Sequence, residues 1–120
     1  MKVTIDKTQL STELEQALKL SDSNYKKASV IYLKKIKQYI PYVERELKAG
    51  RRLTKYPPML NSWERSDLKA ALEALRLHKG INVEIDDREL TQLKDGIKRL
   101  HEDAETTMTS LNAVSYVDDR

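Results

Sequence analysis

Apolar residues recur at three- and four-residue intervals along most of the chain, a spacing typical of amphipathic helices. Four segments carry this pattern, and each begins near a residue type that commonly caps a helix. The segments begin at Asp6, within residues 21–24, at Asn61 and at Asp86. Three of these starts have capping-box spacing, namely Asp6 with Gln9, Asn61 with Glu64 and Asp86 with Glu89.

The second segment carries the widest apolar stripe. On a helical wheel, an arc of about 120° contains Tyr25, Tyr32, Leu33, Ile36, Tyr39, Ile40, Val43 and Leu47. This is the width of a face that packs on a core. Pro41 lies inside the segment and is expected to kink the helix or split it, since proline removes one amide donor and crowds the preceding turn. Gly50 is placed to end this helix, and Gly80 to end the next one, with His78 and Lys79 in its last turn.

Two short stretches, residues 2–5 and 81–85, alternate polar and apolar side chains as strands do. Each leads through an aspartate into a helical pattern, so the two could pair as a ribbon, although two β-prone stretches could also coincide by chance. Residues 51–61 form a long connection without helical period, and residues 112–120 have no pattern and are expected to fray. The sequence therefore predicts a single mainly α domain over residues 1–120, a small bundle of four to five helices, with a short two-stranded β ribbon.

The composition limits both location and chemistry. Cysteine is absent, which fits a reducing compartment, and neither a signal peptide nor an apolar run of about 20 residues is present. We therefore expect a cytoplasmic protein without a membrane partner. Three glycines cannot build a phosphate-binding loop, no nucleophile elbow occurs, and neither His78 nor His101 has zinc-site spacing. A non-enzymatic protein without metal or cofactor is expected.

Charge is distributed very unevenly. Residues 25–56 contain ten basic and two acidic side chains, whereas the rest of the chain contains twelve basic and seventeen acidic ones, for a net charge of +3. Five of the six tyrosines also lie in residues 25–56. Basic side chains near flat rings favour a phosphate-bearing partner with exposed bases. The alternative interpretation is that these cations only form the ordinary solvent-exposed side of a helix.

These features lead to two functional hypotheses. The first is a binding protein for nucleic acid, a nucleotide ligand or a nucleoprotein machine. Its predicted phosphate contacts are Lys34, Lys37, Arg51, Arg52 and Lys55, with Tyr42 or Tyr56 for stacking. The alternative is a protein–protein adaptor or inhibitor that docks on an acidic protein surface. Its predicted apolar anchors are Val30, Ile31, Tyr56, Met59 and Leu60.

Two further expectations concern assembly and origin. The last helical pattern spaces its apolar residues at alternating intervals of three and four from Leu90 to Ala104, which suits either packing within the chain or a homo-oligomer. The cysteine-free, charge-rich composition is reminiscent of small phage accessory proteins that act on host machinery, a likeness of composition that no motif carries.

Overall fold

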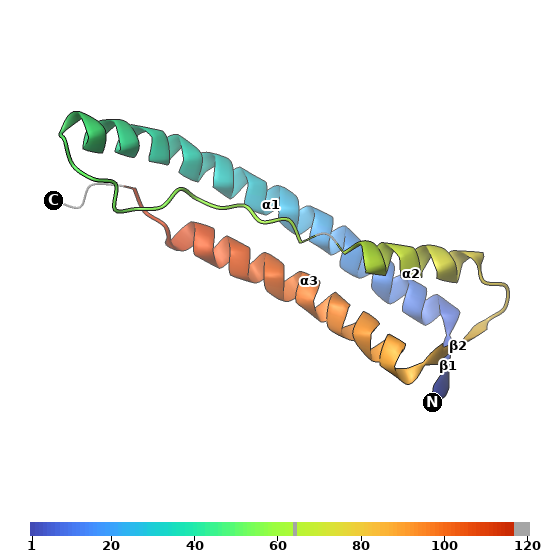
Figure 1. The fold of residues 1–120 in the computed structure, drawn as a ribbon. Helices are drawn as coiled ribbons and strands as arrows, with labels where there is room; N and C mark the ends of the chain where they lie inside the picture. Colours follow the sequence, from blue (N-terminus) through green and yellow to red (C-terminus); the bar gives the residue numbers. More distant parts are fainter. Residues whose placement is uncertain (64, 117–120) are drawn as a thin grey trace. The chain divides into compact units, whose positions relative to one another are not determined.

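A computed structural model describes residues 1–63 and 65–116. The elements in chain order are β1 (Lys2–Asp6), α1 (Lys7–Lys48), α2 (Ser66–Leu77), β2 (Asn82–Asp86) and α3 (Asp87–Ala113) (Figure 1). The described residues thus form a mainly helical fold with a two-stranded sheet. They contain three helices, so the expectation of four to five is wrong.

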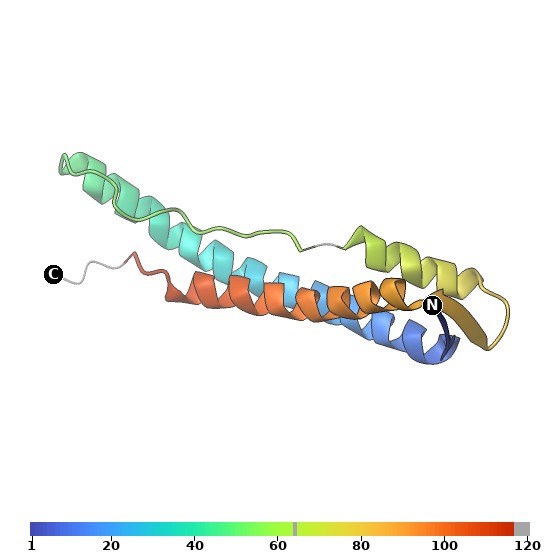
Figure 2. The same ribbon diagram turned by 60° about the horizontal axis from the view of Figure 1, so that its bottom comes forward.

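The chain divides into two compact units. Unit 1 consists of Met1–Ser23 with Trp63–Asp103, and unit 2 of Asn24–Ser62 with Ala104–Arg120. Both α1 and α3 contribute residues to each unit. Within unit 2, the connection after α1 runs back alongside that helix (Figures 1 and 2).

The reduction in helix number has its cause in α1, which continues through both predicted breaks. Ser21 and Asn24, expected to begin a new helix, are buried inside one continuous helix. Pro41 lies within the same helix and does not split it. Proline removes a single backbone hydrogen bond, and Pro41 is exposed, where water can satisfy the carbonyl that lost its partner.

The ends of the helices agree with the sequence only in part. Gly50 has a φ of +72°, its amide donates to the carbonyl of Leu47, and the amide of Arg51 donates to that of Glu46, as in a Schellman motif. Helix α2, in contrast, begins at Ser66 after Arg65, without a side-chain cap. The predicted cap at Asn61 is therefore wrong, and Glu64 lies outside the described residues.

The C-terminal end of α2 also differs from the prediction. The helix ends at Leu77, so His78 and Lys79 follow it rather than form its last turn. Gly80, with a φ of +122°, lies in the turn before β2. The glycine thus opens the turn into the strand, and His78 is the residue that closes the helix.

The predicted ribbon is confirmed in unit 1. Strands β1 and β2 pair antiparallel, with Val3 opposite Ile85 and Ile5 opposite Val83. An oxygen of Asp6 accepts the amide of Gln9 at 3.1 Å at the start of α1. Alternation and capping, both local signals, located the two strands and the start of α1, and the structure adds that the strands pair.

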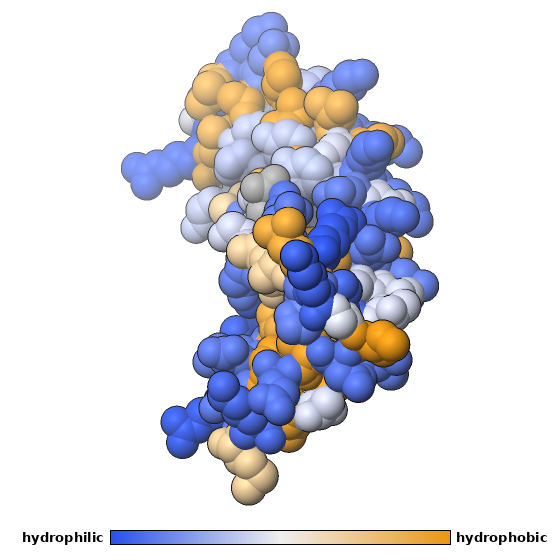
Figure 3. Space-filling model, turned by 90° about the vertical axis from the view of Figure 1, so that its right-hand side faces the viewer, coloured by the Kyte–Doolittle hydropathy of each residue, from blue (hydrophilic) through white to orange (hydrophobic). Residues whose placement is uncertain are grey.

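Leucines form most of the core of unit 1. The buried side chains include Leu10, Leu14, Trp63, Leu68, Leu72, Leu75 and Leu100. Figure 3 views the molecule from the end where β2 lies and shows a mostly hydrophilic surface with scattered hydrophobic patches. In unit 2 the buried apolar and aromatic side chains include Ala28, Tyr42, Ala104, Leu111 and Tyr116.

One expectation about the last helix needs correction and another stays a prediction. Leu100 and Ala104 of its apolar row are buried, whereas Leu90, Leu93 and Ile97 are half-buried, so a homo-oligomer through this row stays a prediction. The helix continues to Ala113, and Tyr116 is buried, so residues 112–116 are not a frayed tail. Residues 117–120 lie outside the described part of the chain.

Candidate functional site

The face of α1 that packs within unit 2 is not its most apolar face. Asn24, Ala28, Tyr42 and Glu46 are the buried residues of this half of the helix. Leu33, Ile40 and Leu47, which the wheel assigned to the core, are 57%, 53% and 59% exposed. At 100° per residue the two sets are centred about 140° apart. The predicted core stripe is therefore largely at the surface.

Polar contacts explain this choice of face. The hydroxyl of Tyr42 accepts hydrogen bonds from the amides of Thr54 and Lys55, at 3.0 and 3.1 Å, and lies 3.3 Å from the hydroxyl of Thr54. The carboxylate of Glu46 accepts two hydrogen bonds from the guanidinium group of Arg51, at 2.6 and 3.4 Å. Both contacts attach the returning connection to the less apolar side of α1. They satisfy a buried phenol and a buried carboxylate, whose desolvation would otherwise be costly.

The last residues of the described chain bind to the same side of α1. Lys35, Arg45 and Lys55 donate hydrogen bonds to the carbonyls of residues 114, 116 and 115, at 2.6, 3.3 and 2.9 Å. Cations next to the carbonyl end of a helix are electrostatically favourable. Three of the ten cations in residues 25–56 therefore have a structural role that the sequence pattern did not reveal.

Three tyrosine rings pack together at this side of α1. The centroid of Tyr116 lies 5.0 Å from that of Tyr39 and 5.7 Å from that of Tyr42. Burial raises the pKa of Tyr116, whereas the hydrogen bond with Thr54 lowers the pKa of Tyr42. The hydroxyl of Tyr116 donates to the carbonyl of Tyr56, which anchors the connection. These rings are part of the fold rather than of an open surface.

The residues of the nucleic-acid hypothesis consequently separate into two groups. Tyr42 is 4% exposed and offers no open face for stacking, so that role is wrong. Arg51 binds Glu46, and Lys55 binds the C-terminal segment. Six of the seven residues are exposed, and of these Lys34, Lys37, Arg52 and Tyr56 have side chains without such a contact among the described residues. Because Tyr42 is buried, the structure does not present all seven residues at one anion-binding surface.

The exposed side of α1 instead presents an apolar seam, which we define as Leu33, Ile36, Ile40, Val43 and Leu47. Ile36 and Val43 are half-buried, between the three exposed members. The intervals alternate between three and four residues, the spacing by which two helices pack. From Leu33 to Leu47 the seam extends about 21 Å at 1.5 Å per residue.

A row of cations borders this seam. The lysine row, defined as Lys26, Lys27, Lys34, Lys37 and Lys48, lies within an arc of about 100° and is exposed. Within residues 1–63 and 65–116 none of the five side chains makes an ion pair or a hydrogen bond. Glu44 is the exposed acidic side chain of this half of α1. The seam thus has a strongly positive border.

The anchors of the protein-binding hypothesis lie near the surface as well. Val30 and Met59 are 66% and 67% exposed, and the ring of Tyr56 is 86% exposed. Ile31 and Leu60 are half-buried. Because the carbonyl of Tyr56 accepts the hydroxyl of Tyr116, the backbone is held while the ring projects outward.

Among the described residues, no three side chains of His, Asp or Glu gather in a way that could hold a metal ion. None of the helices in the described ranges combines the length and apolar character that crossing a membrane requires. In comparisons with known proteins, no family model, no curated protein and no solved structure matches this chain.

Proposed function

We propose that this protein acts as a non-enzymatic binding module whose seam on α1 packs against an acidic amphipathic helix of a partner protein. The observation that carries the proposal is the orientation of α1, whose widest apolar stripe is left at the surface of unit 2. Exposed aliphatic surface bordered by polar residues is characteristic of protein interaction sites. Leu33, Ile40 and Leu47 would be the central contacts.

The shape and charge of the seam favour a helix as the partner element. Alternating intervals of three and four residues over two heptads match the anchor spacing of a helix that lies in a groove or along another helix. Glutamate or aspartate beside the partner's apolar stripe would pair with Lys34 and Lys37. Such complementary charge speeds association and selects the partner more than it raises affinity.

Nucleic acid is the second candidate, favoured by the lysine row. Its five members carry no counter-charge within the described ranges, and Arg52 and Tyr56 are exposed on the connection. Affinity that rests on phosphate contacts should fall steeply between about 50 and 200 mM salt, because bound counterions are released. Aliphatic side chains such as Leu33 and Ile40 add nothing to phosphate binding, which is why we rank a protein partner first.

A pair of matched peptides tests the ranking. The probe is a synthetic helix of about three heptads with leucine at the apolar positions and glutamate at the flanks, and its control carries lysine at the flanks. Fluorescence anisotropy should show binding of the acidic peptide and none of the basic peptide. A fluorescent single-stranded DNA of mixed sequence provides the comparison with nucleic acid.

Two variants assign the binding to the seam or to the lysines. The triple substitution Leu33→Gln, Ile40→Gln and Leu47→Gln should abolish peptide binding and leave the helical circular dichroism unchanged, because these side chains are exposed. The substitution Lys26→Gln with Lys27→Gln should weaken DNA binding more than peptide binding. Unchanged peptide affinity in the triple variant, or no binding of the acidic peptide, would refute the seam as a protein-binding site.

A further inference from the structure

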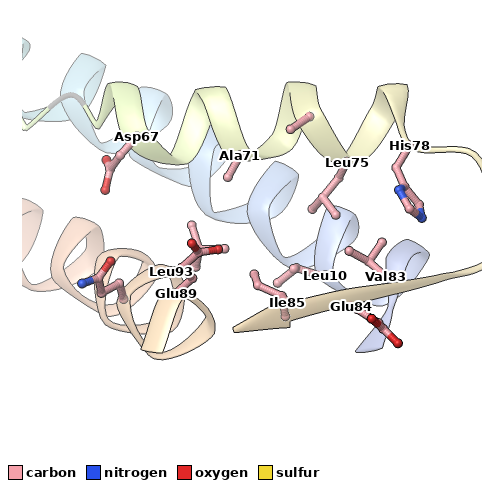
Figure 4. Close-up of a pocket in the computed structure, with 12 residues that line it drawn as sticks. Leu10, Asp67, Ala71, Leu75, His78, Val83, Glu84, Ile85, Glu89 and Leu93 are labelled. Atoms are coloured by element: carbon pink, nitrogen blue, oxygen red, sulfur yellow. The ribbon is translucent and has the colours of Figure 1, made fainter. Parts of the chain in front are cut away.

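A second candidate site lies within unit 1, apart from the residues of the α1 seam. A cavity of about 450 Å³ opens between α2, β2 and the first turns of α1 and α3 (Figure 4). Pockets for small ligands commonly have volumes of 300–1,000 Å³. The wall is mainly apolar and includes Leu10, Ala71, Leu75, Val83, Ile85 and Leu93.

The carboxyl groups among the lining residues are not matched by any lining lysine or arginine. Asp67 on α2, Glu84 on β2 and Glu89 on α3 are its ionisable carboxyls, and neither lysine nor arginine lines it. Figure 4 shows Asp67 projecting from α2 toward the cavity and Glu89 lying beside Leu93 on the opposite side. The side chain of Glu84 points away on the other face of β2, so a ligand in this cavity meets negative charge from Asp67 on α2 and Glu89 on α3.

The carboxylates differ in how far they are already neutralised. Arg65 donates two hydrogen bonds to Asp67, at 3.0 and 2.8 Å, so Asp67 has its cation. Glu84 and Glu89 form no ion pair or side-chain hydrogen bond within the described ranges. His78, the remaining titratable lining residue, places Nε2 3.0 Å from the carbonyl of Asn82. Glu89 is thus the carboxylate best placed to accept a cation from a ligand.

We propose that this cavity binds a small hydrophobic amine, with its apolar body against Leu75, Val83 and Ile85 and its ammonium group at Glu89. Burial of the apolar body provides most of the affinity. The carboxylate selects for the protonated amine over a neutral or anionic compound with the same body. An anion would meet the carboxylate of Glu89 without any lining lysine or arginine and is excluded by repulsion.

Three compounds with the same apolar body test the proposal on the full chain. They are 3-phenylpropylamine, 3-phenylpropanol and 3-phenylpropionate, titrated near pH 7 while backbone and methyl resonances are followed by NMR. The amine should bind most tightly, the alcohol more weakly by about three- to tenfold, which corresponds to roughly 1 kcal/mol. The anionic compound, 3-phenylpropionate, should show no saturable binding. The changes in chemical shift should be largest at Leu75, Val83 and Ile85.

Two substitutions make the result specific to this cavity. Glu89→Gln should remove the preference for the amine over the alcohol and leave alcohol binding unchanged. Ala71→Leu places a larger side chain in the cavity and should abolish binding of both compounds. If that larger side chain disturbs folding, the Glu89→Gln variant still tests the preference for the amine. Glu89 is exposed, so its replacement should leave the fold intact. Equal affinities for amine and carboxylate, or a preference that survives Glu89→Gln, would overturn the proposal.

Discussion

The ammonium group of Lys35 donates a hydrogen bond of 2.6 Å to the backbone carbonyl of Val114, the first residue after α3. Lys55 and Arg45 bind the next two carbonyls. The last carbonyls of a helix lack partners inside the helix, and cations compensate both this lack and the helix dipole. Part of the positive charge of residues 25–56 therefore stabilises the fold.

Replacing Lys35 should destabilise the protein, although the replacement of a surface lysine usually changes stability little. Lys35→Met removes a charged donor from a half-buried carbonyl, and we expect a loss of about 1–2 kcal/mol in the free energy of unfolding. Lys34→Met is the matched control, because Lys34 is exposed and has no partner within the described ranges. Urea unfolding followed by circular dichroism measures both. Equal midpoints for the two variants would contradict the structural role of Lys35.

The phenol of Tyr42 should be more important for stability than its ring alone suggests. Tyr42→Phe leaves the amides of Thr54 and Lys55 without their acceptor and should cost about 1–2 kcal/mol. Tyr56→Phe is the control, since that ring is exposed. Denaturant midpoints are the measurement. A Tyr42→Phe variant as stable as the control would show that the connection is held by other contacts.

Substitution of leucines in unit 2 by alanine should lower the free energy of unfolding by different amounts, depending on which side of α1 is packed. Leu111→Ala, at a side chain 2% exposed, should lower the free energy of unfolding by about 2–5 kcal/mol. Leu47→Ala, at a side chain 59% exposed, should change it by less than about 0.5 kcal/mol. Thermal and urea unfolding of the two variants test this directly. A large loss at Leu47 would mean that the wheel had assigned the packed face correctly.

Acid should weaken the contribution of two ion pairs in unit 1. Hydrogen bonds from Arg65 and Arg76 lower the pKa of Asp67 and Glu15, respectively. A carboxyl whose pKa is lower in the folded chain stabilises folding above its ordinary pKa of about 4, and this contribution disappears as the pH falls through the folded value. Unfolding temperatures measured from pH 6 to pH 2 should therefore decline on the acid side.

The double substitution Asp67→Asn and Glu15→Gln isolates this effect. Because the variant lacks both titrating carboxyls, its unfolding temperature should be lower at pH 6 and should decline less toward pH 2. A decline as steep as that of the unsubstituted protein would assign the acid sensitivity to other carboxyls.

The sequence by itself determined the local elements. Alternation located both strands of the ribbon, because that signal arises from neighbours within a few residues. The spacing of apolar residues located the helical stretches but not their number, since α1 continues through residues 21–24 and α2 begins at Ser66. The residue type of Gly50 predicts a helix end, and its φ of +72° is one that glycine adopts without steric cost. The capping-box spacing of Asp6 and Gln9 predicts a helix start, and an oxygen of Asp6 accepts the amide of Gln9.

Only the tertiary structure decided which side of α1 is packed. A helical wheel shows where apolar residues gather but not whether the same chain covers them. In unit 2 the covering segments, residues 51–56 and 114–116, attach through the polar groups of Lys35, Tyr42, Arg45 and Glu46, on the less apolar side. Buried polar groups must find partners, and that requirement outweighed the burial of Leu33, Ile40 and Leu47 and left the seam exposed.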